Sequence, residues 1–185
     1  MAKKSKMFKF KIDKKIISDA TNQCENHNFG KRSEANGTKK EQIVGLIGEQ
    51  MIRDLFNAGQ IDGSIGFDGG YDIKINNKLI DVKTMGRNCD PRKGFVSNFM
   101  KLQENHKANY FIFTSLNKKT KHLSVCGWIS KKEFLDKCDF YSKGSFRTRT
   151  NGTKFKLKAG LYEIDNDKLN KVNTPEELIK QIKND

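Results

Sequence analysis

Apolar residues recur along the chain with two different periods, and these periods predict where helices and strands lie. Residues 38–57 place apolar side chains three or four positions apart, the spacing of a helix with one buried face. Residues 71–75 and 79–84 alternate apolar and polar side chains, as strands do. Residues 109–115 are apolar almost throughout, which is expected of a central strand. The pattern predicts a mixed α/β fold with a central sheet flanked by helices.

The segments on both sides extend this pattern within a single domain, since no internal repeat or linker is visible. Residues 1–15 form a basic arm that includes a short strand at 8–12, and residues 117–185 extend the same domain. Three helix starts carry Ser or Thr followed three residues later by Glu, a capping box. Further strands are expected over 60–67, 122–128, 143–158 and 160–164, and further helices over 13–26, 95–106, 130–138 and from residue 174 onward.

A tight turn at Asn76-Asn77 joins the strands 71–75 and 79–84 into a hairpin, because Asn tolerates the positive φ that such turns need. A two-residue loop places Asp72 directly opposite Asp81. Like charges that face each other across a strand pair are destabilising. A divalent cation between the two carboxylates would account for the arrangement.

Lys83 lies on the same face as Asp81, because strand side chains alternate, and Ile80 and Val82 then point to the buried face. The alternative interpretation is an exposed hairpin whose charges are merely solvated. Asp-x-Lys alone is a very common tripeptide and does not decide between the two.

The hairpin resembles the signature of the PD-(D/E)xK phosphodiesterase superfamily, which includes restriction enzymes, junction resolvases and small phage nucleases. Asp72 is followed after eight residues by Asp81-Val82-Lys83. Tyr71 stands where the family name has proline, which is a departure from the pattern. The resemblance implies a restriction-endonuclease-like αβββαβ core over residues 38–116, with Asp72, Asp81 and Lys83 catalytic.

The same resemblance implies one or two Mg²⁺ ions, for which Mn²⁺ can substitute. Asp72, Asp81 and the carbonyl of Val82 would hold one ion. Many members carry a Glu on the helix before the first core strand, and Glu49 matches in position, so it would complete a second site. The alternative is an ordinary surface glutamate. We also expect that Gly45 and Gly48 allow this helix to pack closely on the sheet, since glycine destabilises a helix interior.

The net charge of +14 favours a polyanionic partner, most simply DNA, duplex or branched, with RNA as the less favoured partner. Gln103 extends an apolar stripe toward the sheet and either reaches the site or is a satisfied core amide. The residues predicted to contact nucleic acid are Arg87, Arg92, Lys93, Gln103, Arg147, Arg149, Lys154 and Lys156, in the loop 87–93 and on a basic face of strands 143–158.

No apolar stretch approaches the length of a membrane span, and no signal peptide is visible, so we expect a cytoplasmic protein of a bacterial or phage-infected cell. The four cysteines include no CxxC pair, and free thiols in a reducing compartment explain them better than zinc at Cys24 and His27.

Three functions remain open at this stage. The first is a Mg²⁺-dependent endonuclease, either restriction-like or junction-resolving, for which the resemblance implies a homodimer when both strands are cut. The second is a nuclease-fold module that binds DNA or RNA without cutting it. The third is a basic protein that binds RNA or an acidic protein, which would leave the opposed aspartates unexplained.

Overall fold

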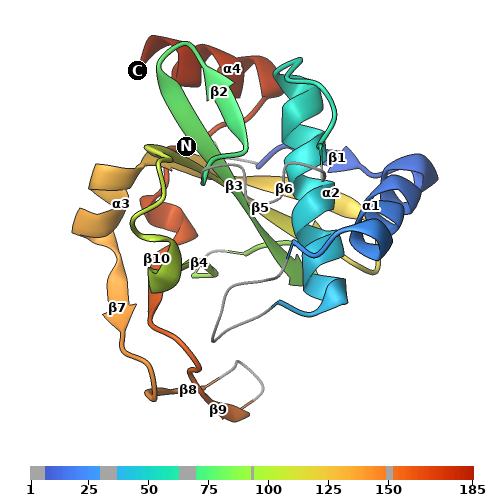
Figure 1. The fold of residues 1–185 in the computed structure, drawn as a ribbon. Coiled ribbons are helices and arrows are strands. Elements are labelled where there is room, and N and C mark those ends of the chain that lie inside the picture. The colour runs from blue at the N-terminus through green and yellow to red at the C-terminus, as the bar shows by residue number, and fades with distance from the viewer. Residues whose placement is uncertain (1–6, 30–36, 63–69, 93, 149–151) are drawn as a thin grey trace.

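A five-stranded mixed sheet forms the centre of the fold (Figure 1). Its strands lie in the order β1 (Lys9–Lys11), β6 (His122–Ser130), β5 (Tyr110–Asn117), β3 (Lys78–Arg87) and β2 (Ile73–Ile75). Strands β3 and β5 are parallel, and the other neighbouring pairs are antiparallel. The computed structural model describes residues 7–29, 37–62, 70–92, 94–148 and 152–185.

Four α-helices lie within these residues: α1 (Lys14–Asn26), α2 (Lys39–Leu55), α3 (Lys131–Lys137) and α4 (Pro175–Asn184). Helices α2, α3 and α4 begin at the three capping residues that were expected, and α1 begins after Asp13, for which no cap was predicted. The side chains of Asp13, Thr38, Ser130 and Thr174 accept hydrogen bonds from backbone N–H groups of the first turns. None of the helices described is long and apolar enough to cross a membrane.

A second sheet and a two-stranded ribbon complete the fold. The second sheet has the order β4 (Val96–Met100), β10 (Leu161–Asp165) and β7 (Asp139–Tyr141). The ribbon pairs β8 (Phe146–Thr148) with β9 (Lys154–Lys156). The mixed α/β fold and its mixed central sheet are therefore confirmed.

Apolar clusters cover both faces of the central sheet. On one face Ile80 and Val82 pack in a cluster with Ile52 of α2 and Leu178 of α4. On the other face the phenylalanines of β5 pack with β4, β10 and α3, in a cluster that includes Phe99, Phe111, Phe113, Phe134 and Ile164. The predicted alternation of β3 is thus confirmed, because Ile80 and Val82 are buried on one face while Asp81 and Lys83 point toward the second sheet.

Of the two glycines in α2, Gly48 is in close contact with β3 and Gly45 is not. A Cβ built on Gly48 would lie 1.9 Å from Oγ1 of Thr84, so any larger residue would collide with the strand. A Cβ on Gly45 would have nothing within 4 Å. The expectation that both glycines are needed for close packing is therefore wrong for Gly45.

The predicted helix over residues 95–106 is wrong. Val96–Met100 form β4, and a short 3-10 turn follows at Lys101–Gln103. Ser97 and Phe99 are the buried residues of β4, which is the alternation of a strand, and Ser97 Oγ lies 2.7 Å from Oδ1 of Asn166. Pairing with β10, far along the chain, decides this segment. The second helix of an αβββαβ core is consequently missing from this position.

The strand expected over residues 60–67 also differs. Residues 60–62 are not in a strand, and the rest of that segment lies outside the described residues. The strand predicted near the N-terminus and the helix predicted at the C-terminus are confirmed, at residues 9–11 and 175–184.

Substitution of the two glycines by alanine tests how α2 is held on the sheet. Gly45→Ala should raise the free energy of unfolding by up to about 1 kcal/mol, the difference in helix propensity. Gly48→Ala should lower it by roughly 1–3 kcal/mol, because the added methyl group overpacks the contact with Thr84. Denaturant unfolding of both variants measures the difference. Equal stabilisation by the two substitutions would mean that α2 is not fixed through Gly48.

Candidate active site

The β2–β3 hairpin places Asp72 and Asp81 opposite each other, in the predicted register. Ile73 pairs with Ile80, so Asp72, one residue before Ile73, lies opposite Asp81, one residue after Ile80. The backbone N–H of Asp72 donates to the Ile80 carbonyl at 2.8 Å, and the N–H of Val82 donates to Oδ2 of Asp72 at 2.6 Å. Asn76 in the turn has φ of 53°, the positive value that the turn was expected to require.

Asp81 is held inside the protein by an ion pair with Lys83. The residue is only 4% exposed, and its Oδ2 lies 2.7 Å from Nζ of Lys83. The Lys83 ammonium also lies 5.6 Å from the ring centroid of Phe99, on the second sheet. The alternative of an exposed hairpin with solvated charges therefore does not describe this site.

Glu49 approaches the hairpin from α2. Its Oε1 lies 3.6 Å from a guanidinium nitrogen of Arg53, one turn further along the helix. The same nitrogen donates to the backbone carbonyl of Asp72 at 2.6 Å. Arg53 therefore links the helix carboxylate to the start of the hairpin, and the close packing at Gly48 brings the helix near enough for this link.

Negatively charged neighbours influence Asp72 more strongly than positively charged ones. Burial raises the pKa of Asp72 well above its usual value, and the carboxylates of Asp81 and Glu49 raise it further. The Lys83 ammonium and the hydrogen bond from Val82 lower it, but less. Three carboxylates thus act on one another with a single lysine among these influences, and a bound cation would relieve their repulsion.

The donor set fits a hard divalent cation, although it is not a finished cage. Within the described ranges, no three His, Cys, Asp or Glu side chains are placed to hold an ion by themselves. Mg²⁺ commonly binds one or two carboxylates and takes its other ligands from water and substrate phosphates. Asp72 and Asp81 suit that mode, with Glu49 nearby, and the carbonyl of Val82 as a ligand stays a prediction.

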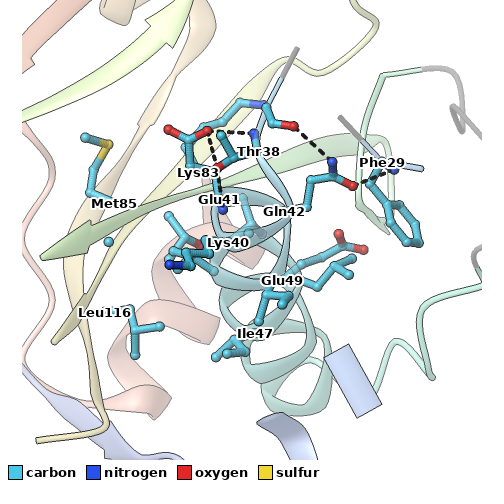
Figure 2. Close-up of a pocket in the computed structure, with 18 of the residues that line it drawn as sticks. Phe29, Thr38, Lys40, Glu41, Gln42, Ile47, Glu49, Lys83, Met85 and Leu116 are labelled. Atoms are coloured by element: carbon cyan, nitrogen blue, oxygen red, sulfur yellow. Dashed lines mark hydrogen bonds between the residues drawn. The ribbon is translucent and has the colours of Figure 1, made fainter. Parts of the chain in front are cut away.

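The site opens into a cavity of about 1680 Å³. Glu49 and Lys83 lie among its lining residues, shown in Figure 2, and so do Asp72 and Asp81. Gln103 lies in a 3-10 turn, is 6% exposed and also lines the cavity, and its contact with the hairpin carboxylates stays a prediction. Lys156 of the ribbon lines the same cavity.

Two residues near the site were not expected from the sequence. His106 lines the cavity and packs closely on Gly70, where an added Cβ would lie 2.5 Å from the Cβ of His106. Nζ of Lys131 donates to the His106 carbonyl at 2.8 Å. Burial lowers the pKa of Lys131, while Glu104 and Asp81 act in the opposite direction. No spacing in the sequence connects these residues to the hairpin, because only the tertiary fold brings them there.

Several predicted nucleic-acid contacts are engaged elsewhere or lie outside the described residues. Arg87 donates to the Val96 carbonyl at 2.6 Å and lies 4.6 Å from the Phe95 ring centroid, so it braces the loop. Arg92 is exposed. Lys93 and Arg149 fall outside the described residues.

The basic face predicted for strands 143–158 is partly wrong. Arg147 pairs with Phe155, whereas Lys156 pairs with Phe146 and Lys154 with Thr148. Directly paired residues share a face, so Arg147 points away from the two lysines. It forms an ion pair with Glu163 and stacks 3.8 Å from the Tyr141 ring centroid. The register between the strands, not visible in either strand alone, separates these charges.

Asp72→Asn tests whether the site is electrostatically strained. Because the folded-state pKa of Asp72 is raised, the folded protein loses stability as the pH rises above the usual aspartate range. The amide removes the charge and keeps an oxygen acceptor for Val82. In EDTA at neutral pH the variant should melt above the wild type, by about 2–4 °C per kcal/mol of repulsion relieved. Adding Mg²⁺ should raise the melting temperature of the wild type more than that of the variant.

The control for this comparison is Asp19→Asn, an exposed aspartate on α1. Its melting temperature should respond to Mg²⁺ as the wild type does. A wild-type melting temperature that is indifferent to Mg²⁺ and equal to that of Asp72→Asn from pH 4 to pH 8 would contradict the cation site.

Comparison with models of known protein families, with curated proteins and with solved structures returned no match to this chain. What the site does must therefore follow from its own residues and geometry.

Proposed function

We propose that this protein is a metal-dependent nuclease that hydrolyses phosphodiester bonds in DNA, with its active site at the β2–β3 hairpin. The observation that carries the proposal is the opposition of Asp72 and Asp81, with Lys83 2.7 Å from Asp81, in a large cavity. The net charge of +14 supports a polyanionic substrate, and lysines line the same cavity as the carboxylates.

The resemblance to the PD-(D/E)xK superfamily supports the same activity at the level of the motif. A helix that bears Glu49 precedes the hairpin, and β5 then lies parallel to β3. The helix that such a core would place before β5 is replaced here by β4. The proposal therefore depends on the hairpin and its neighbours rather than on the complete core.

Hydrolysis joins a water oxygen to phosphorus, breaks the bond to the leaving oxygen and transfers a proton to that oxygen. A bound divalent cation supplies Lewis acidity and favours ionisation of the attacking water. Asp72 and Asp81 would hold it, and Glu49 would hold either a second ion or the water. The Lys83 ammonium lies beside these carboxylates and can donate hydrogen bonds to a phosphate oxygen or to the water.

A second function is favoured by one observation. The ion pair between Asp81 and Lys83 occupies one carboxylate oxygen, and the described part of the chain holds no ready cluster of three metal-binding side chains. A module that binds nucleic acid without cutting it would tolerate that arrangement. Cleavage assays separate the two functions directly.

Asp81→Asn and Lys83→Met test the nuclease proposal. Each should lower the rate of cleavage at least about 100-fold, the usual contribution of a positioned catalytic group, because each removes a charge at the reacting phosphate. The measurement uses supercoiled, linear, single-stranded and branched DNA with Mg²⁺ or with EDTA. Lys74→Met, on the exposed face of β2, is the matched control and should cleave at the wild-type rate. Wild-type cleavage by both site variants would remove the hairpin from the mechanism.

Glu49→Gln tests the contribution of α2. Activity should fall and should need a higher Mg²⁺ concentration, since the amide keeps the shape but binds cations poorly. The melting temperature should change little, because the contact with Arg53 is long, at 3.6 Å. Glu25→Gln, on the exposed part of α1, is the control. An unchanged Mg²⁺ requirement would make Glu49 a structural partner of Arg53 alone.

A further inference from the structure

The β8–β9 ribbon is a separate small sheet at one end of the molecule, away from the central sheet (Figure 1). Such two-stranded pairs are marginal by themselves. Its inner face is anchored by Arg147, which pairs with Glu163 of β10 and stacks on Tyr141. Backbone bonds of 2.9 Å from Gly144 to Leu157 and from Leu157 to Ser145 fix its base.

The outer face of the ribbon combines an aromatic ring with lysines. Phe146 is 69% exposed, the highest value among the exposed large apolar residues of the described chain. It pairs directly with Lys156, and Thr148 pairs with Lys154 on the same face. All four side chains are exposed. The surface made by Phe146, Thr148, Lys154 and Lys156 is called the outer ribbon face below.

The ribbon also forms one wall of the cavity that holds the carboxylates. Lys156 and Lys158 line this cavity together with Asp72, Asp81 and Lys83. The lysines of this wall can therefore offset the repulsion between the carboxylates and an anionic chain bound in the cavity.

We propose that the outer ribbon face binds an unpaired nucleic-acid strand, with one base stacked on Phe146 and adjacent phosphates on Lys154 and Lys156. The inference rests on the proposed nuclease function and adds a substrate class to it: DNA with a single-stranded segment beside the cleaved bond. Aromatic rings that alternate with basic side chains are the usual platform for single strands.

The chemistry of the surface distinguishes this occupant from two others. Bases in a duplex are already stacked on both sides, so only an unpaired base can offer a free face to Phe146. Protein interfaces deplete lysine at their cores, whereas Phe146 has a lysine directly opposite it. Stacking on a base requires only one ring with cations around it, which is what this face provides.

Binding in EDTA tests the inference without cleavage. Dissociation constants are measured by fluorescence anisotropy for a single-stranded DNA, an RNA of the same sequence and the corresponding DNA duplex. Phe146→Ala should weaken single-strand binding roughly 5- to 150-fold, the effect of losing one stacked base, and should leave duplex binding almost unchanged. Phe146→Trp should bind as tightly as the wild type, and Phe146→Leu should resemble the alanine variant.

A salt titration tests the lysines separately. Lys154→Ala and Lys156→Ala should each flatten the dependence of log K on log salt by about 0.7 for a single strand. Lys132→Ala, an exposed lysine on α3, and Leu135→Ala, an exposed apolar residue on the same helix, are the matched controls and should leave both affinity and slope unchanged.

The outcomes separate this inference from the proposed function. Single-strand affinity that is unchanged in Phe146→Ala overturns the inference, and so does an equal loss on single strand and duplex. Either result is compatible with Mg²⁺-dependent cleavage by the wild type. Conversely, a wild type that never cleaves but loses single-strand affinity on Phe146→Ala overturns the nuclease proposal and keeps the binding surface. Melting temperatures check that every variant is folded.

Discussion

The opposition of two carboxylates across the β2–β3 pair is the constraint on which the site depends. A slip of one residue in the pairing would move Asp81 and Lys83 to the face covered by α2 and α4. Burial of Ile73, Ile80 and Val82 prevents that slip, since each is 6% exposed or less. The apolar residues of the hairpin thus hold its charged residues against their mutual repulsion, which is how a core can maintain an electrostatically unfavourable arrangement.

The neighbours of the hairpin soften this repulsion without removing it. Lys83 offsets Asp81 and the N–H of Val82 satisfies Asp72, yet the pKa of Asp72 remains raised. Arg53 binds the Asp72 carbonyl, so its charge acts at the backbone and at Glu49 more than at the Asp72 carboxylate. A deficit of positive charge therefore persists at one point in a strongly basic protein. We infer that folding leaves this deficit for a cation to fill.

The parts of the fold that follow from short-range interactions could be predicted from sequence. The turn at Asn76, the cap at Thr38 and the alternation in β3 depend on residues close in the chain, and all are confirmed. The segment 95–106 could not be predicted, because Val96, Phe99 and Met100 suit the spacing of a helix as well as that of a strand. Only pairing with β10, which lies more than sixty residues later, selects the strand.

The candidate site divides in the same way. Asp72, Asp81 and Lys83 come from one hairpin, and a local turn is sufficient to bring them together. The basic residues are spread over elements whose mutual register sets their direction, so Arg147 turns inward while Lys156 lines the cavity. This separation matters for an anionic substrate. The carboxylates repel a phosphate, and lysines that line the same cavity can offset that repulsion, whereas arginines bound in structural ion pairs cannot. The charge available to a substrate is therefore smaller than the composition suggests.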